Sequence, residues 1–252
     1  MRNILLTLRY DGSRYHGWQV QQNAQSVQAV LQNAMEGLLG ARPDVKGCSR
    51  TDAGVHADMF CVSFQTDSRT PCERIIPALN VRLPFDIAVY GCREVPLSFH
   101  ARYSCKGKRY CYRIYNAPVR NPFWQDRALH YRHSLDAGLL HEAAQAFVGR
   151  HDFAAFCSSK SDVEDTVRTV WAAKVERDGD LVTFSVEGDG FLYNMVRIMV
   201  GTLLEVAQGK RSKASIKASL ESGQRTAAGP TAPACGLILE RVFYDERDFI
   251  EE

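Results

Sequence analysis

A two-residue turn between two apolar runs constrains the fold of this chain most strongly. Val170 to Glu176 and Leu181 to Glu187 both have the pattern of strands, and Asp178-Gly179 lies between them. An Asp-Gly pair between strands is typical of a tight β-hairpin, whose central residues need a positive φ. The chain therefore has to build at least one antiparallel sheet.

Further strands and helices follow one another along the chain. Ser26 predicts the N-cap of an amphipathic helix that stops at Gly40, and a longer helix is expected from about 192 to 208. Additional strands are expected at 3–10, 59–65, 87–95, 108–115 and 237–244, and shorter helices at 73–80, at 139–149 and after 212. This order is a meander rather than a strict βαβ alternation, which predicts an α+β fold with mainly antiparallel sheets.

The length of 252 residues allows one large domain or two modest ones at roughly 150 residues per domain. The basic stretch at 102–108 is the expected boundary, which gives an N-terminal α+β domain at 1–104 and a C-terminal α+β domain at 105–252. A hinge between two sheets is a common place for a cleft. The polar segments 158–165 and 223–234 are expected to be the least structured.

Composition excludes several other classes. With 45% hydrophobic and 24% charged residues, the chain is typical of globular domains rather than disordered or fibrous ones. Apolar runs are too short for a membrane span, and the apolar start Ile4–Leu6 is too short for a signal peptide. The eight cysteines contain no C-x-x-C pair, so reduced free thiols in a cytosolic chain are favoured over structural zinc or disulfides.

The net charge of +2 conceals an uneven distribution. Residues 100–135 contain eight lysines and arginines against the single acid Asp126, a local charge of +7. The tail at 240–252 contains six acids against two arginines, a local charge of −4. A basic stretch with interleaved aromatic residues is typical of a surface that binds a nucleic-acid backbone and stacks on bases.

The segment Gly47–Ala57 places an arginine, an aspartate and a histidine within seven residues, among small side chains. Taken alone, Asp52 fits a side chain that caps an Asx turn. It also fits a carboxylate presented from a tight loop as a nucleophile or base, which the adjacent Arg50 would keep ionised. Both interpretations stay open on the residues of this segment alone.

Five separated motifs decide between these interpretations, because together they resemble the tRNA pseudouridine synthases of the A type. They are Tyr10–Gln19, Arg50–His56, Phe99–Arg102, Lys108–Tyr112 and Phe191–Gly201. They occur in the family's order and extend over essentially the whole chain. Ser49 is a departure, because the family has a glycine before the arginine, and serine disfavours a positive φ there.

The resemblance implies roles for three catalytic residues. Asp52 corresponds to the family's nucleophilic aspartate. Tyr110 corresponds to the tyrosine that stacks on the target base and helps to remove its C5 proton. Arg197 corresponds to the arginine that pairs with the nucleophile, although the helical pattern alone indicates a surface charge. Tyr112 and Tyr115 are interpreted as core tyrosines, and His56 as a loop histidine whose hydrogen bonds are satisfied.

Other basic residues are assigned to RNA binding. Arg50 is expected to fill the space left by the extruded uridine or to hold its phosphate. Four further residues are expected to contact the substrate, together with Tyr110: Arg102, Lys106, Lys108 and Arg109.

The resemblance also implies a substrate, a fold and an assembly. The expected reaction isomerises uridine to pseudouridine at positions 38, 39 and 40 of the tRNA anticodon stem-loop, without a metal or organic cofactor. The expected fold has two ferredoxin-like, RRM-like halves that meet at a central catalytic cleft, and the expected assembly is a cytoplasmic homodimer.

Two other function classes are weaker. A non-catalytic RNA-binding module would have no use for Asp52, Tyr110 and Arg197 together. A nucleoside hydrolase would release free base and would not need the basic aromatic stretch. The sequence does not decide whether Asp52 attacks C1′ of the sugar or C6 of the ring.

Overall fold

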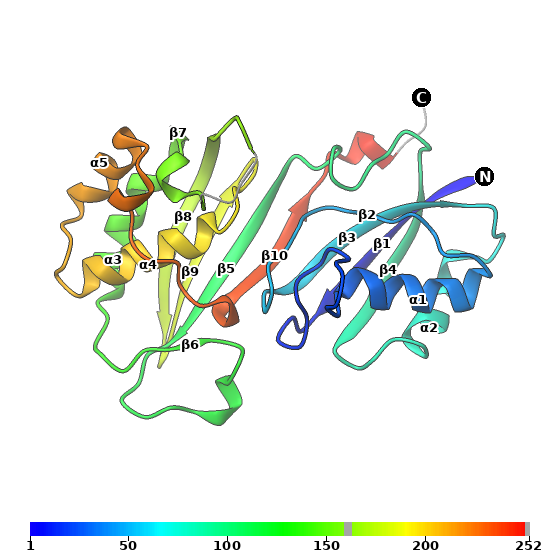
Figure 1. The fold of residues 1–252 in the computed structure, drawn as a ribbon, viewed down its shortest axis with the longest axis horizontal. Helices are drawn as coiled ribbons and strands as arrows, with labels where there is room; N and C mark the ends of the chain where they lie inside the picture. Colours follow the sequence, from blue (N-terminus) through cyan, green and yellow to red (C-terminus); the bar gives the residue numbers. More distant parts are fainter. Residues whose placement is uncertain (159–162, 250–252) are drawn as a thin grey trace. The chain divides into compact units, whose positions relative to one another are not determined.

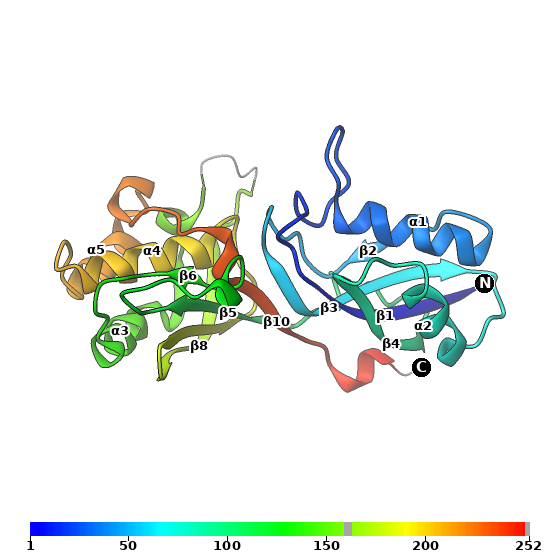
Figure 2. The same ribbon diagram turned by 90° about the horizontal axis from the view of Figure 1, so that it is seen from below.

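The computed structural model describes residues 1–158 and 163–249. Part of the polar segment 158–165 and the end of the acidic tail therefore lie outside the described residues. The chain divides into two compact units, one of residues 1–107 with 238–252 and one of residues 108–237 (Figures 1 and 2). The predicted division at 104/105 placed the C-terminal segment in the second domain. The structure groups it with the first unit, because Ile238 pairs with His56 in a neighbouring parallel strand.

The first unit is built on a mainly antiparallel sheet. Its strand order is β4 (Ile87–Val95), β1 (Arg2–Tyr10), β3 (His56–Thr66) and β10 (Leu237–Phe243), with β2 (Lys46–Gly47) paired to β3. The central strand β1 is antiparallel to both of its neighbours. Its apolar side chains Ile4, Leu6 and Leu8 are completely buried, so this strand forms the centre of the core.

The first unit also contains the helices α1 (Val27–Leu39) and α2 (Cys72–Asn80), which pack against each other. The predicted ends of α1 are confirmed. Ser26 Oγ accepts a hydrogen bond from the Ala29 N–H, and Gly40 ends the helix in the left-handed conformation at φ 76°. Pro77 lies inside α2, as predicted for that helix.

The second unit also contains an antiparallel sheet. Its order is β5 (Gly107–Tyr115), β9 (Leu181–Gly188), β8 (Val167–Asp178) and β7 (Gly149–Asp152), and the short β6 (Leu129–His130) runs parallel to β5. The hairpin predicted from Asp178-Gly179 joins β8 to β9, with Gly179 at φ 55°. Both units thus mix helices with mainly antiparallel strands, which confirms the α+β class.

The second unit contains the helices α3 (Ala137–Ala144), α4 (Met195–Ala207) and α5 (Ala214–Ser222). Helix α3 packs against β8 and α4. The predicted long helix at 192–208 begins three residues later because Asn194, at φ 62°, holds the left-handed conformation. Short 3-10 turns occupy Pro122–Trp124, Gln145–Phe147, Ala154–Phe156, Arg225–Ala227, Ala234–Gly236 and Glu246–Phe249.

The eight cysteines are free thiols in the structure. Burial raises the pKa of the Cys61 thiol to about 12, so this thiol is protonated at neutral pH. Among the helices of the described residues, none has the length and hydropathy needed to cross a bilayer.

Candidate active site

Asp52 begins a tight turn just before β3. The Asp52 carbonyl accepts a hydrogen bond from the Val55 N–H at 3.1 Å, and Gly54 stands at the third position with φ 77°. A glycine at this position suits a type II turn, which needs a positive φ there. The preceding Thr51 is buried, and its hydroxyl lies 2.7 Å from the Tyr10 hydroxyl. The turn therefore presents Asp52, which is half-buried, from a fixed backbone.

The segment Tyr10–Trp18 holds this turn by close backbone contact. The Trp18 N–H donates to the Thr51 carbonyl, and the Gly54 N–H donates to the Tyr15 carbonyl, both at 3.1 Å. A Cβ on Gly12 would lie 2.0 Å from the Val55 carbonyl oxygen, and a Cβ on Gly17 2.4 Å from the Thr51 oxygen. Only glycine allows this approach, which gives a physical reason for the spacing of the first motif.

Trp18 and Tyr15 anchor the same segment to the core of the first unit. The indole of Trp18 is 3% exposed and its ring centroid lies 4.2 Å from that of Phe60 on β3. The Tyr15 hydroxyl donates to the Asp86 carboxylate at 2.8 Å. Burial, followed by this hydrogen bond, raises the pKa of Tyr15, so the phenol stays neutral and serves as a structural donor.

His56 has the structural role expected for it. Its buried Nδ1 accepts a hydrogen bond from the Gly12 N–H at 3.1 Å, and the Asp11 carboxylate lies 3.2 Å from the same atom. The imidazole thus ties the first motif to the start of β3.

Tyr110 lies on β5 in the second unit, opposite Val186 of β9. It is 7% exposed, and its ring meets Phe191 edge to face, with centroids 5.1 Å apart and planes at 78°. An edge-to-face pair fixes the ring plane of a tyrosine. The neighbouring Tyr112 is fully buried and its hydroxyl donates to the Pro233 carbonyl at 2.8 Å, which confirms its place in the core.

Arg197 lies in the first turns of α4 and is half-buried rather than fully at the surface. Its Nε donates to the Ala232 carbonyl and its Nη1 to the Asn194 side chain, both at 2.7 Å. The segment that carries Ala232 packs tightly on the helix, since a Cβ on Gly201 would lie 1.7 Å from the Pro230 carbonyl oxygen. The guanidinium is therefore held in one orientation.

Asp52 and Arg50 lie in the first unit, and Tyr110 and Arg197 in the second. That these residues form one site stays a prediction. Sequence reasoning included Phe191 and Asn194 in the fifth motif but gave them no role, and in the structure they contact Tyr110 and Arg197. A signal for Asn194 was available, since asparagine tolerates the left-handed conformation and stands just before an apolar helical run. Within the described residues, no cluster of three or more His, Cys, Asp or Glu side chains could hold a metal ion.

Comparison with known proteins identifies the family. The tRNA pseudouridine synthase family model matches residues 7–104 and 143–245 of this chain. The chain belongs to the tRNA pseudouridine synthase family. It is 48% identical over 244 residues to tRNA pseudouridine synthase A of Acetivibrio thermocellus, with 97% of this chain and 100% of that protein covered. It is 46% identical over 245 residues to tRNA pseudouridine synthase A of Ruminiclostridium cellulolyticum, with the same coverage of both chains.

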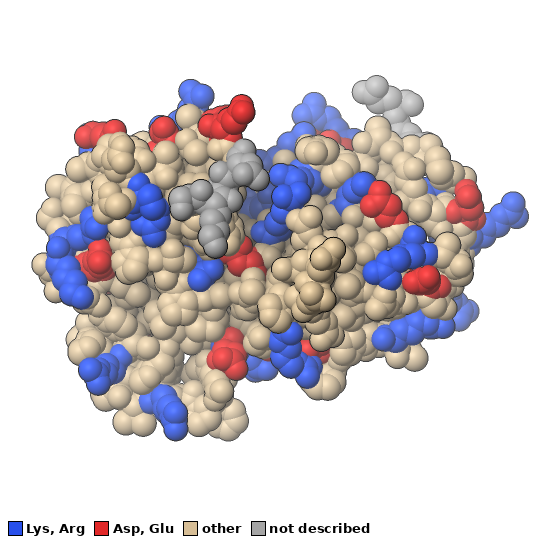
Figure 3. Space-filling view, viewed as in Figure 1, with Lys and Arg blue, Asp and Glu red and all other residues tan. Residues whose placement is uncertain are grey.

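The basic residues assigned to RNA binding in this tRNA pseudouridine synthase differ in whether an acidic side chain lies beside them. Arg109 forms an ion pair with Glu187, its cross-strand neighbour on β9. Lys106 Nζ lies 3.8 Å from Asp248, whereas Arg102 is exposed beside the ring of Tyr103. Lysines and arginines on the face in Figure 3 are likewise interspersed with acids. The local charge of +7 is thus partly neutralised by residues distant in the sequence.

Gly17→Ala tests the glycine contact under the Asp52 turn. The left-handed φ of 85° costs alanine about 1–2 kcal/mol, and the clash with the Thr51 oxygen costs a further ~1–3 kcal/mol in the free energy of unfolding. Gly40→Ala is the matched control, because its φ is 76° and nothing lies within 4 Å of the added Cβ. Urea unfolding of both variants measures the difference, and equal losses would contradict the proposed contact.

Proposed function

We propose that this chain converts uridine to pseudouridine at positions 38, 39 and 40 of the tRNA anticodon stem-loop, with Asp52 as nucleophile. The proposal rests on the Asp52 turn in a chain of this family. The Tyr10–Trp18 segment holds this turn by backbone contacts, two of them at Gly12 and Gly17. A side chain that only caps an Asx turn does not require such close backbone contacts around it. The contacts around the half-buried Asp52 therefore support its catalytic interpretation.

The reaction needs only a positioned carboxylate and a proton acceptor. The bond from N1 of uracil to C1′ breaks, the ring turns, and a bond from C5 to C1′ forms. N1 takes up a proton and C5 releases one, so that the product is an isomer and no oxidant or added group is needed. Asp52 can attack either C1′ or C6, and both routes regenerate the carboxylate.

Two residues of the second unit complete the proposed chemistry. Arg197 pairs with Asp52 and keeps the carboxylate ionised, since a neighbouring cation favours the charged form. The ring of Tyr110 stacks on the target uracil, and its hydroxyl helps to take the C5 proton directly or through water. The predicted cleft between two RRM-like halves belongs to the same proposal.

The enzyme also has to extrude a uridine that lies within the stem-loop. Arg50 precedes the Asp52 turn and its side chain is exposed, which suits a cation that fills the vacated space or holds the phosphate. The proposed working form is a cytoplasmic homodimer, in which one tRNA contacts both subunits.

Arg50→Ala should lower the turnover rate more than the affinity for tRNA. Loss of the cation leaves the flipped nucleotide less stable, at a cost of about 10- to 100-fold in the single-turnover rate. Arg69→Ala, another exposed arginine of the first unit, is the control and should behave as wild type. Single-turnover rates at saturating enzyme measure the effect, and an unchanged rate for Arg50→Ala would count against this role.

The salt dependence of tRNA binding tests the basic residues. Each phosphate contact contributes a slope of about −0.7 to −0.9 to log K against log salt, so four contacts give about −3. Affinity should fall roughly 50-fold between about 0.05 and 0.2 M salt. Filter binding measures this slope, and an affinity that hardly moves would exclude Arg102, Lys106, Lys108 and Arg109 as the main contacts.

The proposed function is tested by mapping pseudouridine in tRNA from cells with and without this gene. Loss of pseudouridine at positions 38, 39 and 40, restored by the wild-type gene and not by the Asp52→Asn gene, is the expected result. An unchanged pattern in cells that have no second enzyme of this specificity would refute it.

A further inference from the structure

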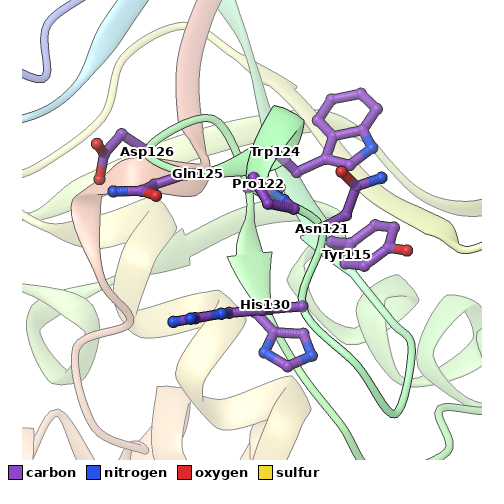
Figure 4. A pocket seen from close by; sticks show the side chains of 9 residues that line it. Tyr115, Asn121, Pro122, Trp124, Gln125, Asp126 and His130 are labelled. Atoms are coloured by element: carbon purple, nitrogen blue, oxygen red, sulfur yellow. The ribbon is translucent and has the colours of Figure 1, made fainter.

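The segment between β5 and β6 in the second unit encloses a pocket that the catalytic proposal does not use. Its volume is about 390 Å³. The lining residues that matter here are Tyr115, Trp124, His130, Arg120, Gln125 and Asp126. Figure 4 shows Trp124 and Tyr115 at one side, Gln125 and Asp126 at the other, and His130 below. The volume is near the lower end of the range for ligand sites, which suits one small flat group.

The backbone of this segment is ordered by its own hydrogen bonds. Asn121 caps the 3-10 turn Pro122–Trp124 by accepting from the Phe123 N–H at 3.0 Å. The Trp124 carbonyl accepts from both the Arg127 and Ala128 N–H groups at 3.1 Å. Asp126 is held at φ 57°, a conformation that few non-glycine residues adopt and that persists only where the surroundings impose it.

The side chains around the pocket have the chemistry that recognises a nucleobase. Trp124 and Tyr115 offer aromatic faces, and His130 is tethered at 2.9 Å from the Ala117 carbonyl. The Gln125 amide and the Asp126 carboxylate, both exposed, can bond to the edge of a base. The surrounding segment 116–132 contains three arginines against that one carboxylate, so its net charge favours a phosphate-bearing ligand.

The pocket lies in the same unit as Tyr110 and Arg197. Its wall residue Tyr115 ends the strand that carries Tyr110. The Cys235 thiol donates at 3.8 Å to the carbonyl of Ala128, a residue that lines the pocket. Burial and then Asp126 raise the pKa of this thiol, whereas Arg197 lowers it, so Cys235 lies within electrostatic range of both.

We propose that this pocket binds an unpaired nucleobase of the tRNA substrate, other than the uridine that reacts, by stacking on Trp124 and bonding to Gln125 and Asp126. The inference rests on the proposed function for the identity of the RNA. It adds a positioning site for a second nucleotide, which would supply affinity and register rather than chemistry.

Trp124→Ala tests the stacking wall. Stacking of a base on an aromatic side chain corresponds to about 5- to 100-fold in affinity, so the Kd for unmodified tRNA should rise by that factor. Trp124→Phe keeps an aromatic face and should stay within about threefold of wild type. Gln125→Ala, at an exposed position, should raise the Kd about 2- to 10-fold without risk to folding. The control is Val119→Ala, since Val119 is 74% exposed in the same segment and does not line the pocket.

Filter binding, pseudouridine formation at saturating enzyme and sedimentation are measured for each variant. The proposal expects weaker binding for Trp124→Ala and Gln125→Ala, rescue by Trp124→Phe and an unchanged molecular mass. An unchanged Kd in both pocket variants overturns it. So does a change in mass, which would make the pocket a contact between two copies. If the wild type binds tRNA but forms no pseudouridine, the proposed function fails and the binding comparison still tests the pocket.

Discussion

Asp52→Asn should abolish pseudouridine formation, with a loss of about 1,000-fold or more in the single-turnover rate, while tRNA still binds within about threefold of wild type. The amide has nearly the shape of the carboxylate, and the hydrogen bond in the Asp52 turn is made by its backbone carbonyl, so the turn should persist. What is lost is the negative oxygen that attacks the sugar or the ring.

The matched control for this variant is Asp58→Asn. Asp58 lies on β3, is exposed, and pairs with Arg9 at 3.4 Å. Its loss removes the same charge from the same unit, and exposed pairs of this kind contribute about 0–1 kcal/mol. Full activity of Asp58→Asn beside an inactive Asp52→Asn separates the nucleophile from the general electrostatics of the unit. Near-wild-type activity of Asp52→Asn would remove Asp52 from the mechanism.

Tyr110→Phe should lower the isomerisation rate about 100-fold or more, with little change in stability or tRNA affinity. The ring remains and can keep its edge-to-face contact with Phe191, so the loss isolates the hydroxyl. If that hydroxyl helps to remove the C5 proton, the final step slows and becomes rate-limiting. Substrate tRNA with deuterium at C5 of uridine should then react more slowly than normal tRNA in the variant.

Tyr112→Phe is the control for this variant, two residues along the same strand. Its hydroxyl bonds only inside the core, to the Pro233 carbonyl, and its loss should cost about 1–3 kcal/mol in the free energy of unfolding. Its isomerisation rate should stay near wild type. An equal rate loss in both variants, or no isotope effect in Tyr110→Phe, would show that Tyr110 supports the fold and not proton removal.

Local signals predicted the parts of the fold that depend on neighbouring residues. Ser26 and Gly40 define α1 because caps act within one turn, and Asp178-Gly179 defines the β8–β9 hairpin for the same reason. The late start of α4 was missed, although an asparagine just before an apolar helical run is a local signal for the left-handed conformation that Asn194 adopts.

Pairing between residues that are far apart in the sequence was harder to predict. Nothing near Ile238 in the sequence indicates that it pairs with His56 in a parallel strand, so the C-terminal segment was assigned to the wrong side of the boundary that the structure draws. The Arg109 and Glu187 pair likewise depends on the register of β5 with β9. The local charge of +7 could be counted from the sequence, but its partial neutralisation could not.

The candidate site divides in the same way. The residue types at Asp52, Tyr110 and Arg197 were predicted through the family motifs. The physical reason for the motif at Tyr10–Trp18 became clear only from the structure. Gly12 and Gly17 let one backbone approach another that is some 40 residues away in the sequence. The pocket beside Trp124 carries no sequence signature of its own, since most of its lining residues come from the connection between β5 and β6.

The most direct test of the account uses purified protein and unmodified tRNA transcripts that carry a single uridine at position 38, 39 or 40. Pseudouridine is mapped at each position after reaction with the wild type and with Asp52→Asn. The account predicts conversion at these positions by the wild type and none by the variant. Conversion at other positions only, or equal conversion by both proteins, would contradict it.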